Sequence, residues 1–136
     1  MVMSSPLPTA ASLDPDDALI CDVFARACPS RAIMENIVGK WGVLALAALL
    51  EGTYRFNALR RRVDGVSEKM LAQTLQNLER DGLVHREVQA TIPARVEYSL
   101  TPAGTRIATQ LVNLLEVIEA EAPAMIAARA GQEPAG

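Results

Sequence analysis

The middle of the chain contains three adjacent side chains that can bind anions: Arg60, Arg61 and Arg62. A guanidinium group carries a planar fork of donors that matches the oxygens of a phosphate. Asp64 and Gly65 follow the run and favour a tight turn, and Ser67 is a residue type that caps a helix. The free N–H groups at the start of such a helix also attract phosphate. This segment therefore predicts an anion-binding surface beside a helix start.

The helix that begins after Ser67 and runs to Arg80 is predicted to have one apolar and one polar face. Leu71, Leu75 and Leu78 recur at helical spacing and would face the core. The side chains expected to face base edges or DNA backbone are Ser67, Lys69, Met70, Gln73, Thr74 and Asn77. Glutamine and asparagine can each make two hydrogen bonds to adenine, and methionine and threonine can touch a thymine methyl. These side-chain types are suited to contact with DNA.

The residues after Gly82 predict a hairpin, because apolar and polar residues alternate there. The alternating positions are Val84, Arg86 and Val88, followed by Val96, Tyr98 and Leu100. The connection from Gln89 to Arg95 contains Pro93 and is longer than a tight two-residue turn, so we expect a projecting loop. Arg95 lies at the end of this loop, where it is expected to reach the sugar-phosphate backbone near the minor groove.

Two helices are predicted before these segments. Asp14 and Pro15 are a capping residue and a first helical residue, and they begin a helix over residues 15–27 that Pro29 ends. Ser30 is expected to cap a second, short helix. Gly39 is expected to end that helix in the left-handed conformation.

The remaining elements surround a central apolar helix. Residues 41–50 are apolar on every side, so their helix belongs in the middle of a bundle, with Trp41 packing the core rather than lining a ligand pocket. Residues 54–56 are expected to form a short extended piece. Thr101 and Pro102 begin a helix that runs to residue 122, where Pro123 breaks or kinks it.

The order of these elements is that of a winged helix-turn-helix, in a fold class that is mainly α (α+β) with helices added at both ends. In this fold the second helix of the pair enters the DNA major groove. A chain of 136 residues is expected to form one such domain over residues 14–122. Residues 1–13 are expected to be a disordered arm, and residues 123–136 a short helix and a frayed tail.

The charge is distributed in a way that fits this interpretation. The net charge is −3, but residues 1–52, 53–106 and 107–136 carry balances of −3, +3 and −3. The cationic part is therefore the predicted DNA-binding part. Two cysteines, not spaced as a redox pair, and no apolar run of membrane-spanning length predict a cytoplasmic protein without a membrane partner.

Three stretches of the chain resemble the HxlR-type winged-helix regulators of bacteria. They are CPSRAIMENIVGKW, RFNALRRRVDGVSEKMLAQTLQNLERDGLVHR and PARVEYSLTPAG, which fall within residues 28–104. The resemblance implies a homodimeric transcription factor that binds an inverted repeat in double-stranded DNA. Gln89, Ala90 and Thr91 depart from the residues that are usual there, all of them in the wing.

The predicted dimer contacts come from the terminal helices, as the resemblance also implies: Leu19, Val23, Ile107, Leu111, Leu114 and Ile118. The C-terminal members of this set form a stripe without an obvious partner inside the domain. A second subunit is the natural partner, and a two-fold dimer would place its recognition helices about 34 to 36 Å apart, or at a multiple of one DNA turn.

Cys28 occupies the position that some relatives use as a thiol sensor of electrophiles or oxidants. Independently of the resemblance, it precedes Pro29 and a helix start, and Arg26 and Arg31 are near in sequence. Both settings favour the thiolate. The alternative is a small buried hydrophobic side chain, which is the usual state of a free cysteine. Control by a small-molecule effector is a further possibility.

Two other classes of function have to be compared with DNA binding: an enzyme and a protein-binding module. An enzyme is not predicted, because the single histidine, His85, leaves no metal-ligand set or catalytic triad, and we expect neither metal nor cofactor. A winged-helix module that binds protein instead of DNA is the alternative function, since a fold does not fix what it binds.

Overall fold

A computed structural model describes residues 22–132 of the chain. The chain divides at Gly39 into two compact units, residues 1–39 and 40–136, which are described separately below. The elements are mostly helices with one small sheet, as the order of the predicted elements indicated. The start of the predicted N-terminal helix, with Leu19 and Cys21, and the predicted arm lie outside the described residues.

In the first unit, the described end of the predicted helix over 15–27 is not helical. Residues 22–27 form turns and bends, and the Asp22 carboxylate accepts a hydrogen bond from the Phe24 backbone N–H at 3.0 Å. A short polar side chain that satisfies a nearby backbone group in this way competes with the helix. Val23, one of the predicted dimer contacts, lies in these turns with 38% of its surface exposed.

Helix α2 spans Pro29–Val38 and corrects the expected roles of three residues. Pro29 begins this helix instead of ending the previous one, because proline lacks an N–H and fits the first turn. The preceding Cys28 is the extended N-cap residue, so Ser30 does not cap. Gly39 is extended, with φ −60° and ψ 152°, rather than left-handed, because the next helix begins at once.

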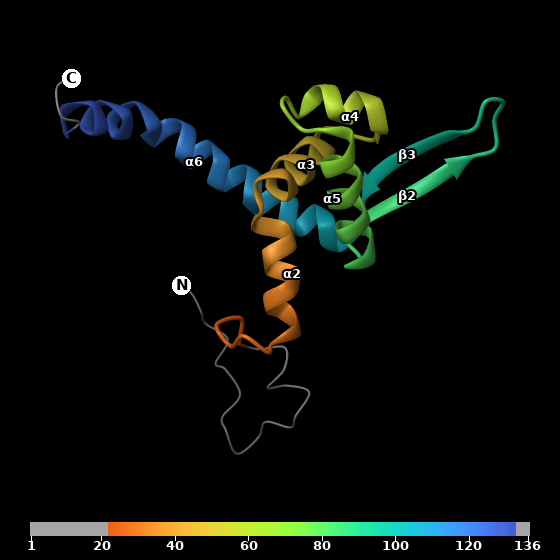
Figure 1. Cartoon of the computed structure of the whole chain (residues 1–136), viewed down its shortest axis with the longest axis horizontal. Helices are drawn as coiled ribbons and strands as arrows, with labels where there is room; N and C mark the ends of the chain where they lie inside the picture. The colour runs from red at the N-terminus through yellow and green to blue at the C-terminus, as the bar shows by residue number, and fades with distance from the viewer. Residues whose placement is uncertain (1–21, 133–136) are drawn as a thin grey trace, which may run out of the picture. The chain divides into compact units, whose positions relative to one another are not determined.

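The second unit is built around helix α3, Lys40–Glu51 (Figure 1). Its buried residues are Gly42, Ala45, Leu46, Ala48 and Leu49, and it packs against helices α4, α5 and α6. The prediction of a central helix without a polar face is confirmed. Trp41 is half-buried, and the Lys40 ammonium group lies 4.5 Å from the centre of its ring. The small side chains of α3 let its neighbours approach closely.

Helices α4, Phe56–Arg62, and α5, Glu68–Arg80, form the predicted helix-turn-helix pair. Their fully buried leucines fill the space beside α3: Leu59, Leu71, Leu75 and Leu78. Gly65 in the turn has φ +92°, a conformation in which any other residue would be strained. The Ser67 hydroxyl accepts a hydrogen bond from the Met70 N–H at 3.1 Å, so the predicted cap is confirmed.

The sheet has three antiparallel strands in the order β1-β3-β2. Strands β2, Val84–Gln89, and β3, Arg95–Leu100, form the predicted hairpin, which projects from the helices as a wing (Figure 1). Strand β1, Tyr54–Arg55, is the short extended piece before α4, and it pairs Tyr54 with Tyr98 and Arg55 with Glu97. The middle of β3 is therefore joined to the start of α4.

Helix α6, Pro102–Gln132, begins one residue after the wing ends. The Thr101 hydroxyl accepts a hydrogen bond from the Gly104 N–H at 3.0 Å and donates one to the Gly82 carbonyl at 2.7 Å. A Cβ atom at Gly104 would overlap the Leu83 carbonyl oxygen, so a glycine is required for this close approach. Because of these contacts, the first turn of α6 is fixed against the start of β2.

The break or kink expected at Pro123 does not end the helix, which continues to Gln132 (Figure 1). A proline inside a helix removes one hydrogen bond at a cost of roughly 3 kcal/mol. The surrounding residues 120–130 are rich in alanine, the best helix former, and this favours continuation of the helix. The C-terminal helix is therefore longer than predicted.

Two further properties concern only the part of the chain that the structure describes. No single helix within residues 22–132 is long and apolar enough to span a membrane. No group of three or more histidine, cysteine, aspartate or glutamate side chains within residues 22–132 is placed to hold a metal ion.

Candidate nucleic-acid interface

The polar face of α5 is the largest part of the candidate interface. Lys69, Met70 and Gln73 are exposed, and they lie opposite the buried leucines because of the helical repeat. Thr74 and Asn77 are half-buried at the margin of this face. Ser67 lies at the start of the helix, where its hydroxyl is used by the cap. All the predicted α5 residues are thus present on or beside one face.

Asn77 is already bound by its neighbours along the helix. Its carbonyl oxygen accepts hydrogen bonds from the Gln73 amide at 3.1 Å and from the Arg80 guanidinium at 2.7 Å. These bonds hold Gln73 in one orientation along the α5 surface. To read an adenine with both of its groups, either amide would have to exchange this internal hydrogen bond for one to the base.

The three arginines of the run do not share one role. The Arg62 guanidinium donates two hydrogen bonds to Glu51, at 2.9 and 2.6 Å, and the Tyr54 hydroxyl donates a third to Glu51 at 2.7 Å. Hydrogen bonds from Arg62 and Tyr54 lower the pKa of Glu51 to about 2. The hydrogen bond to Glu51 raises the pKa of Tyr54. Arg62 therefore ties the end of α4 to the end of α3.

Arg60 and Arg61 are exposed, and no ion pair joins either of them to another residue between 22 and 132. Arg61 lies four residues after Asn57, so both side chains are on the same side of α4. Arg60 projects from another side. The two positive charges of the run that remain available are therefore directed to different parts of the surface.

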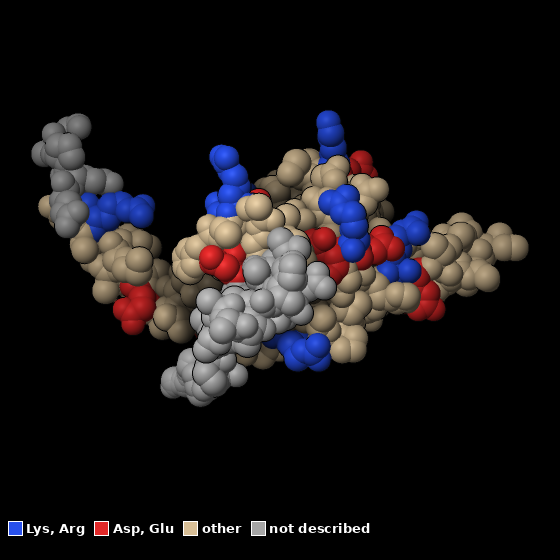
Figure 2. Space-filling view, turned by 90° about the horizontal axis from the view of Figure 1, so that it is seen from below, with Lys and Arg blue, Asp and Glu red and all other residues tan. Residues whose placement is uncertain are grey.

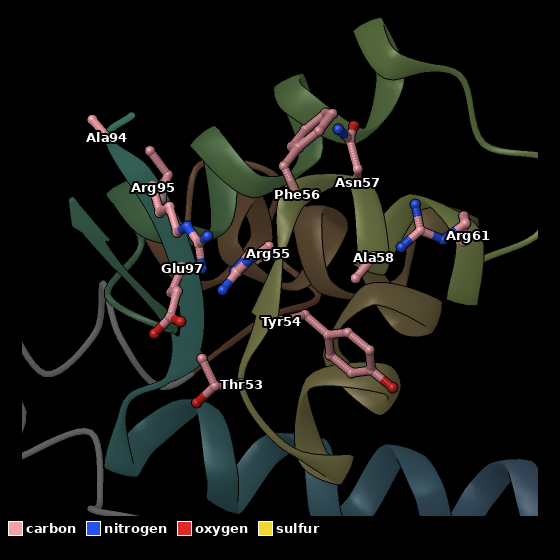
Figure 3. A pocket seen from close by; sticks show the side chains of 11 residues that line it. Thr53, Tyr54, Arg55, Phe56, Asn57, Ala58, Arg61, Ala94, Arg95 and Glu97 are labelled. Carbon is pink, nitrogen blue, oxygen red and sulfur yellow. The ribbon is translucent and has the colours of Figure 1, made fainter. Parts of the chain in front are cut away.

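Arg61 and Asn57 line a pocket of about 610 Å³ between α4, β1 and the first half of β3 (Figure 3). Arg55 and Arg95 line the opposite side of the same pocket, on the neighbouring strands β1 and β3. Glu97 is the cross-strand partner of Arg55 and offsets part of this charge. Three arginines still line this pocket, and the guanidinium group is the side-chain group that matches the oxygens of a phosphate.

Arg55 is a candidate binding residue that the sequence analysis did not select. Arg55 is a single arginine outside the run of three. Its place near Arg95 comes from the pairing of β1 with a strand about 40 residues later in the chain, and the sequence pattern does not reveal that pairing. The one sequence feature that could have indicated Arg55 is its position directly before the first helix of the helix-turn-helix pair. Arg95 was selected as the residue at the end of the loop, and the structure has it there: it is the first residue of β3, it pairs with Gln89 at the loop end of the hairpin, and it lines the same pocket as Arg55.

The tip of the wing carries no charge. Residues 90–94 are Ala, Thr, Ile, Pro and Ala, and Ile92 is fully exposed. In Figure 2 the end of the hairpin is tan, while lysine and arginine form separate patches with acidic residues between them. The charge available to an anion is therefore on β1, on the first residue of β3 directly after this tip, and on α4 and α5.

A family model described as HxlR-like helix-turn-helix matches residues 36–125, which include the whole helix-turn-helix pair and the wing. This chain belongs to the HxlR-like helix-turn-helix family. The resemblance found in the sequence and the winged-helix fold class are therefore confirmed.

The relatives of this HxlR-like chain are transcriptional regulators by name. The HTH-type transcriptional regulator YtfH of Escherichia coli is 48% identical over 108 residues, which are 79% of this chain and 86% of that protein. The structure of the putative transcriptional regulator ytfH from Salmonella typhimurium is 47% identical, has a TM-score of 0.75, and is matched over 79% of this chain and 96% of its own. The relatives named here are regulators rather than enzymes.

A redox regulator is also among the similar structures. The redox regulator HypR in its oxidized form is 36% identical to this HxlR-like chain with a TM-score of 0.63, over 68% of this chain and 96% of that one. Cys28, the predicted sensor, is buried, with 4% of its surface exposed. Burial raises the pKa of its thiol, but hydrogen bonds from Ser30 and Arg31 outweigh it, and the net shift of the pKa is downward.

The predicted dimer residues fall into two groups on α6. Leu111 is buried and Ile107 half-buried, and both lie on the part of α6 that belongs to the packed body of the unit. Leu114 and Ile118 are exposed by 53% and 47%. Further exposed apolar residues continue along the helix: Val117, Met125 and Ile126. The unpartnered stripe therefore begins later than predicted and extends beyond Pro123.

Proposed function

We propose that this chain is a sequence-specific DNA-binding transcription regulator of the HxlR-like family, working in the cytoplasm. The observation that carries the proposal is the open polar face of α5, whose cap and buried leucines hold Lys69, Met70 and Gln73 outward. A capped helix with this face fits the major groove, where such side chains reach base edges. Family membership makes gene regulation the setting.

The arginines support this proposal from both sides of α5. Arg61 on α4, Arg55 on β1 and Arg95 at the loop end of β3 would bind phosphates on the strands that border the groove. Arg60 would add a further phosphate contact. Arg62 would act indirectly, by holding α4 against α3 through Glu51.

We further propose a homodimer that binds an inverted repeat. The exposed apolar residues of α6, from Leu114 to Ile126, leave a long stripe open to water, and a second copy of the same helix would cover it. Each subunit would then place one α5 helix in one half-site. Leu19 and Val23 would add contacts from the N-terminal segment.

The signal proposed for this regulator is modification of the Cys28 thiol by an electrophile or oxidant. The lowered pKa supports reactivity, and the likeness to a redox regulator supports the class of signal. Diamide treatment followed by peptide mapping tests it. We expect modification of Cys28 with a change in DNA affinity, and an unmodified thiol with unchanged affinity would contradict it.

DNA binding is tested by selecting bound fragments from the source genome and measuring affinity for them at several salt concentrations. Each phosphate contact contributes about 0.9 to the slope of log affinity against log salt. Arg61→Ala and Arg55→Ala should each lower the slope by about 1, whereas Arg129→Ala, exposed at the far end of α6, should leave it unchanged.

Arg62→Ala distinguishes the structural role proposed for Arg62 from the phosphate contacts proposed for Arg60 and Arg61. Because Arg62 is bound to Glu51, its loss should leave the salt slope nearly unchanged while lowering the resistance of the protein to urea. A flat salt response of the unmodified protein would favour the alternative function, a winged-helix module that binds protein. In that case Arg61→Ala would also have no effect on the slope.

A further inference from the structure

A second opening in the molecule is not used by the proposed DNA contacts. It is a groove of about 610 Å³ within the second unit, between α3, the turn after α4, and α6. Its floor is formed by aliphatic side chains, most of them half-buried: Leu44, Ala47, Ala48, Leu50, Val63, Val112 and Leu115. An apolar hollow of this size can hold the body of a small organic molecule.

The rim of this groove is strongly acidic. Glu51, Asp64, Glu116 and Glu119 line it, against one cationic side chain, Arg62. Arg62 is already bound to Glu51, so the other three carboxylates are not offset by any cation among the lining residues. All four acidic residues are exposed, which leaves them at the mouth of the groove rather than in its floor.

The groove is connected by hydrogen bonds to the pocket lined by Arg55, Arg61 and Arg95, called the arginine pocket below. Glu51 and Arg62 line the groove, and the Tyr54 hydroxyl that donates to Glu51 belongs to a residue that lines the arginine pocket. Tyr54 is also the β1 neighbour of Arg55. A group that competed for Glu51 would therefore act on the contacts that hold α4 and β1 in place.

We propose that this groove binds an organic cation with an apolar body, such as a lipophilic amine, phosphonium or quaternary ammonium compound. The aliphatic floor would take the apolar part, and the free carboxylates of Glu116, Glu119 and Asp64 would face the positive charge. An organic anion of the same shape would meet the same floor but would be repelled by the rim. Charge at the mouth thus selects the ligand.

Binding would also weaken DNA recognition, a consequence that rests on the proposed function. A cation near Glu51 competes with Arg62 and Tyr54 for that carboxylate. Ligand binding and DNA binding would then be coupled: the ligand favours the network without the Glu51 contacts, and DNA favours the network with them. The same coupling free energy weakens each binding event when the other has occurred. The site itself does not depend on DNA, so the two statements can fail separately.

The test uses two probes of nearly equal shape and opposite charge, tetraphenylphosphonium and tetraphenylborate, with the full-length protein. Calorimetric titration measures the affinities of both probes. Trp41, the single tryptophan, lies beside Gly65 in the turn that also contains Asp64, so its fluorescence gives a second measure of binding at the groove. We expect the cation to bind at least ten-fold more tightly than the anion. Equal affinity, or tighter binding of the anion, would overturn the proposal.

Two variants locate the site. Glu116→Gln combined with Glu119→Gln should weaken binding of the phosphonium by roughly three- to thirty-fold, since each exposed charge contributes modestly. Glu121→Gln, exposed on the same helix but outside the groove, is the control. Ala47→Leu fills the floor without changing charge and should also weaken binding. Unchanged binding in both groove variants would place the cation elsewhere and overturn the proposal.

A second copy of the chain is the competing occupant of the groove. If the groove lies inside the dimer, Ala47→Leu should change the oligomeric state by light scattering and the unmodified dimer should not bind the phosphonium. That outcome also overturns the proposal. In a final arm, the phosphonium should weaken binding to a selected DNA fragment. Absence of DNA binding without any ligand would instead contradict the proposed function and leave the titration result standing.

Discussion

Glu51 receives hydrogen bonds from two side chains on different elements, and this small network separates the roles of three adjacent arginines. A run of like charges is usually a solvated face. Here one member is held at the side of α4 that turns toward α3. Arg62 follows the buried Leu59 by three residues, so both lie toward the same side of the helix.

The Glu51 network should make stability depend on pH in the acid range. Because the pKa of Glu51 is lowered from its usual 4.5 to about 2, the ionised carboxylate stabilises the folded state above pH 4.5. This stabilisation should be lost progressively as the pH falls from 4.5 to 2. Urea unfolding of the unmodified protein and of Glu51→Gln should therefore differ at pH 6 and converge near pH 2.

Glu121→Gln is the matched control for the acid experiment, since Glu121 is exposed on α6. It should follow the unmodified protein at every pH. A difference between the unmodified protein and Glu51→Gln that stays constant from pH 6 to pH 2 would show that the ionisation of Glu51 is not what stabilises the fold.

The sequence predicted residue types at the candidate site better than it predicted their partners. The leucine repeat placed Lys69, Met70 and Gln73 on the open face of α5, because the helical period alone decides that. The partner of Arg62 lies 11 residues away on another helix. The neighbours of Arg55 depend on strand pairing. No local pattern encodes either contact.

At the scale of elements, the ends of the helices follow local chemistry where a side chain can satisfy the backbone. Ser67 and Thr101 both cap the helices that the sequence assigned to them. The residues around Pro29 were interpreted in the wrong order because proline is compatible with the end of one helix and the start of the next. The sequence pattern did not distinguish these two arrangements.

The cap at Ser67 should contribute measurably to stability. Ser67→Ala removes the acceptor for the Met70 N–H and should lower the free energy of unfolding by about 1 kcal/mol. Ser67→Asp keeps an acceptor at the same place and should stay close to the unmodified protein. Urea unfolding followed by circular dichroism measures both variants. An equal loss in the two would mean that the cap hydrogen bond is not the cause.

The length of helix α6 and the formation of strand β1 are two properties that the sequence pattern alone does not decide. A proline within a helix predicts a break, but alanine-rich flanks carry the helix past Pro123. Tyr54 and Arg55 are too few to form a strand alone, and pairing with β3 makes them one. Both outcomes depend on free-energy balances of a few kcal/mol that sequence patterns do not resolve.

At the scale of the whole unit, the packing of α6 on the start of β2 depends on one missing side chain. Gly104→Ala would place a Cβ on the Leu83 carbonyl, and should destabilise the protein by roughly 1 to 3 kcal/mol or prevent folding. Gly131→Ala on the same helix meets no atom within 4 Å and should be neutral or stabilising by up to roughly 1 kcal/mol. Thermal unfolding compares the two, and similar melting temperatures would contradict the close-approach argument.

The exposed stripe of α6 gives a prediction for assembly. If a second copy covers Leu114 and Ile118, then Ile118→Asp removes a buried aliphatic side chain from each subunit. Burial of two such side chains contributes roughly 3 to 6 kcal/mol, so the dimer should weaken by about a hundred-fold or more. Light scattering at micromolar concentration should show a monomer, while Gln110→Asp, exposed earlier on the helix, should remain dimeric.

The joint at Thr101 connects the wing to the helix that carries the stripe, and it contains a single residue. Its hydroxyl is bonded on both sides, so there is no slack between the end of β3 and the first turn of α6. Insertion of one residue there would rotate the whole helix by about 100° relative to the sheet. If α6 carries the dimer contact as proposed, such an insertion would turn the exposed apolar stripe away from its partner without altering a residue of the stripe itself.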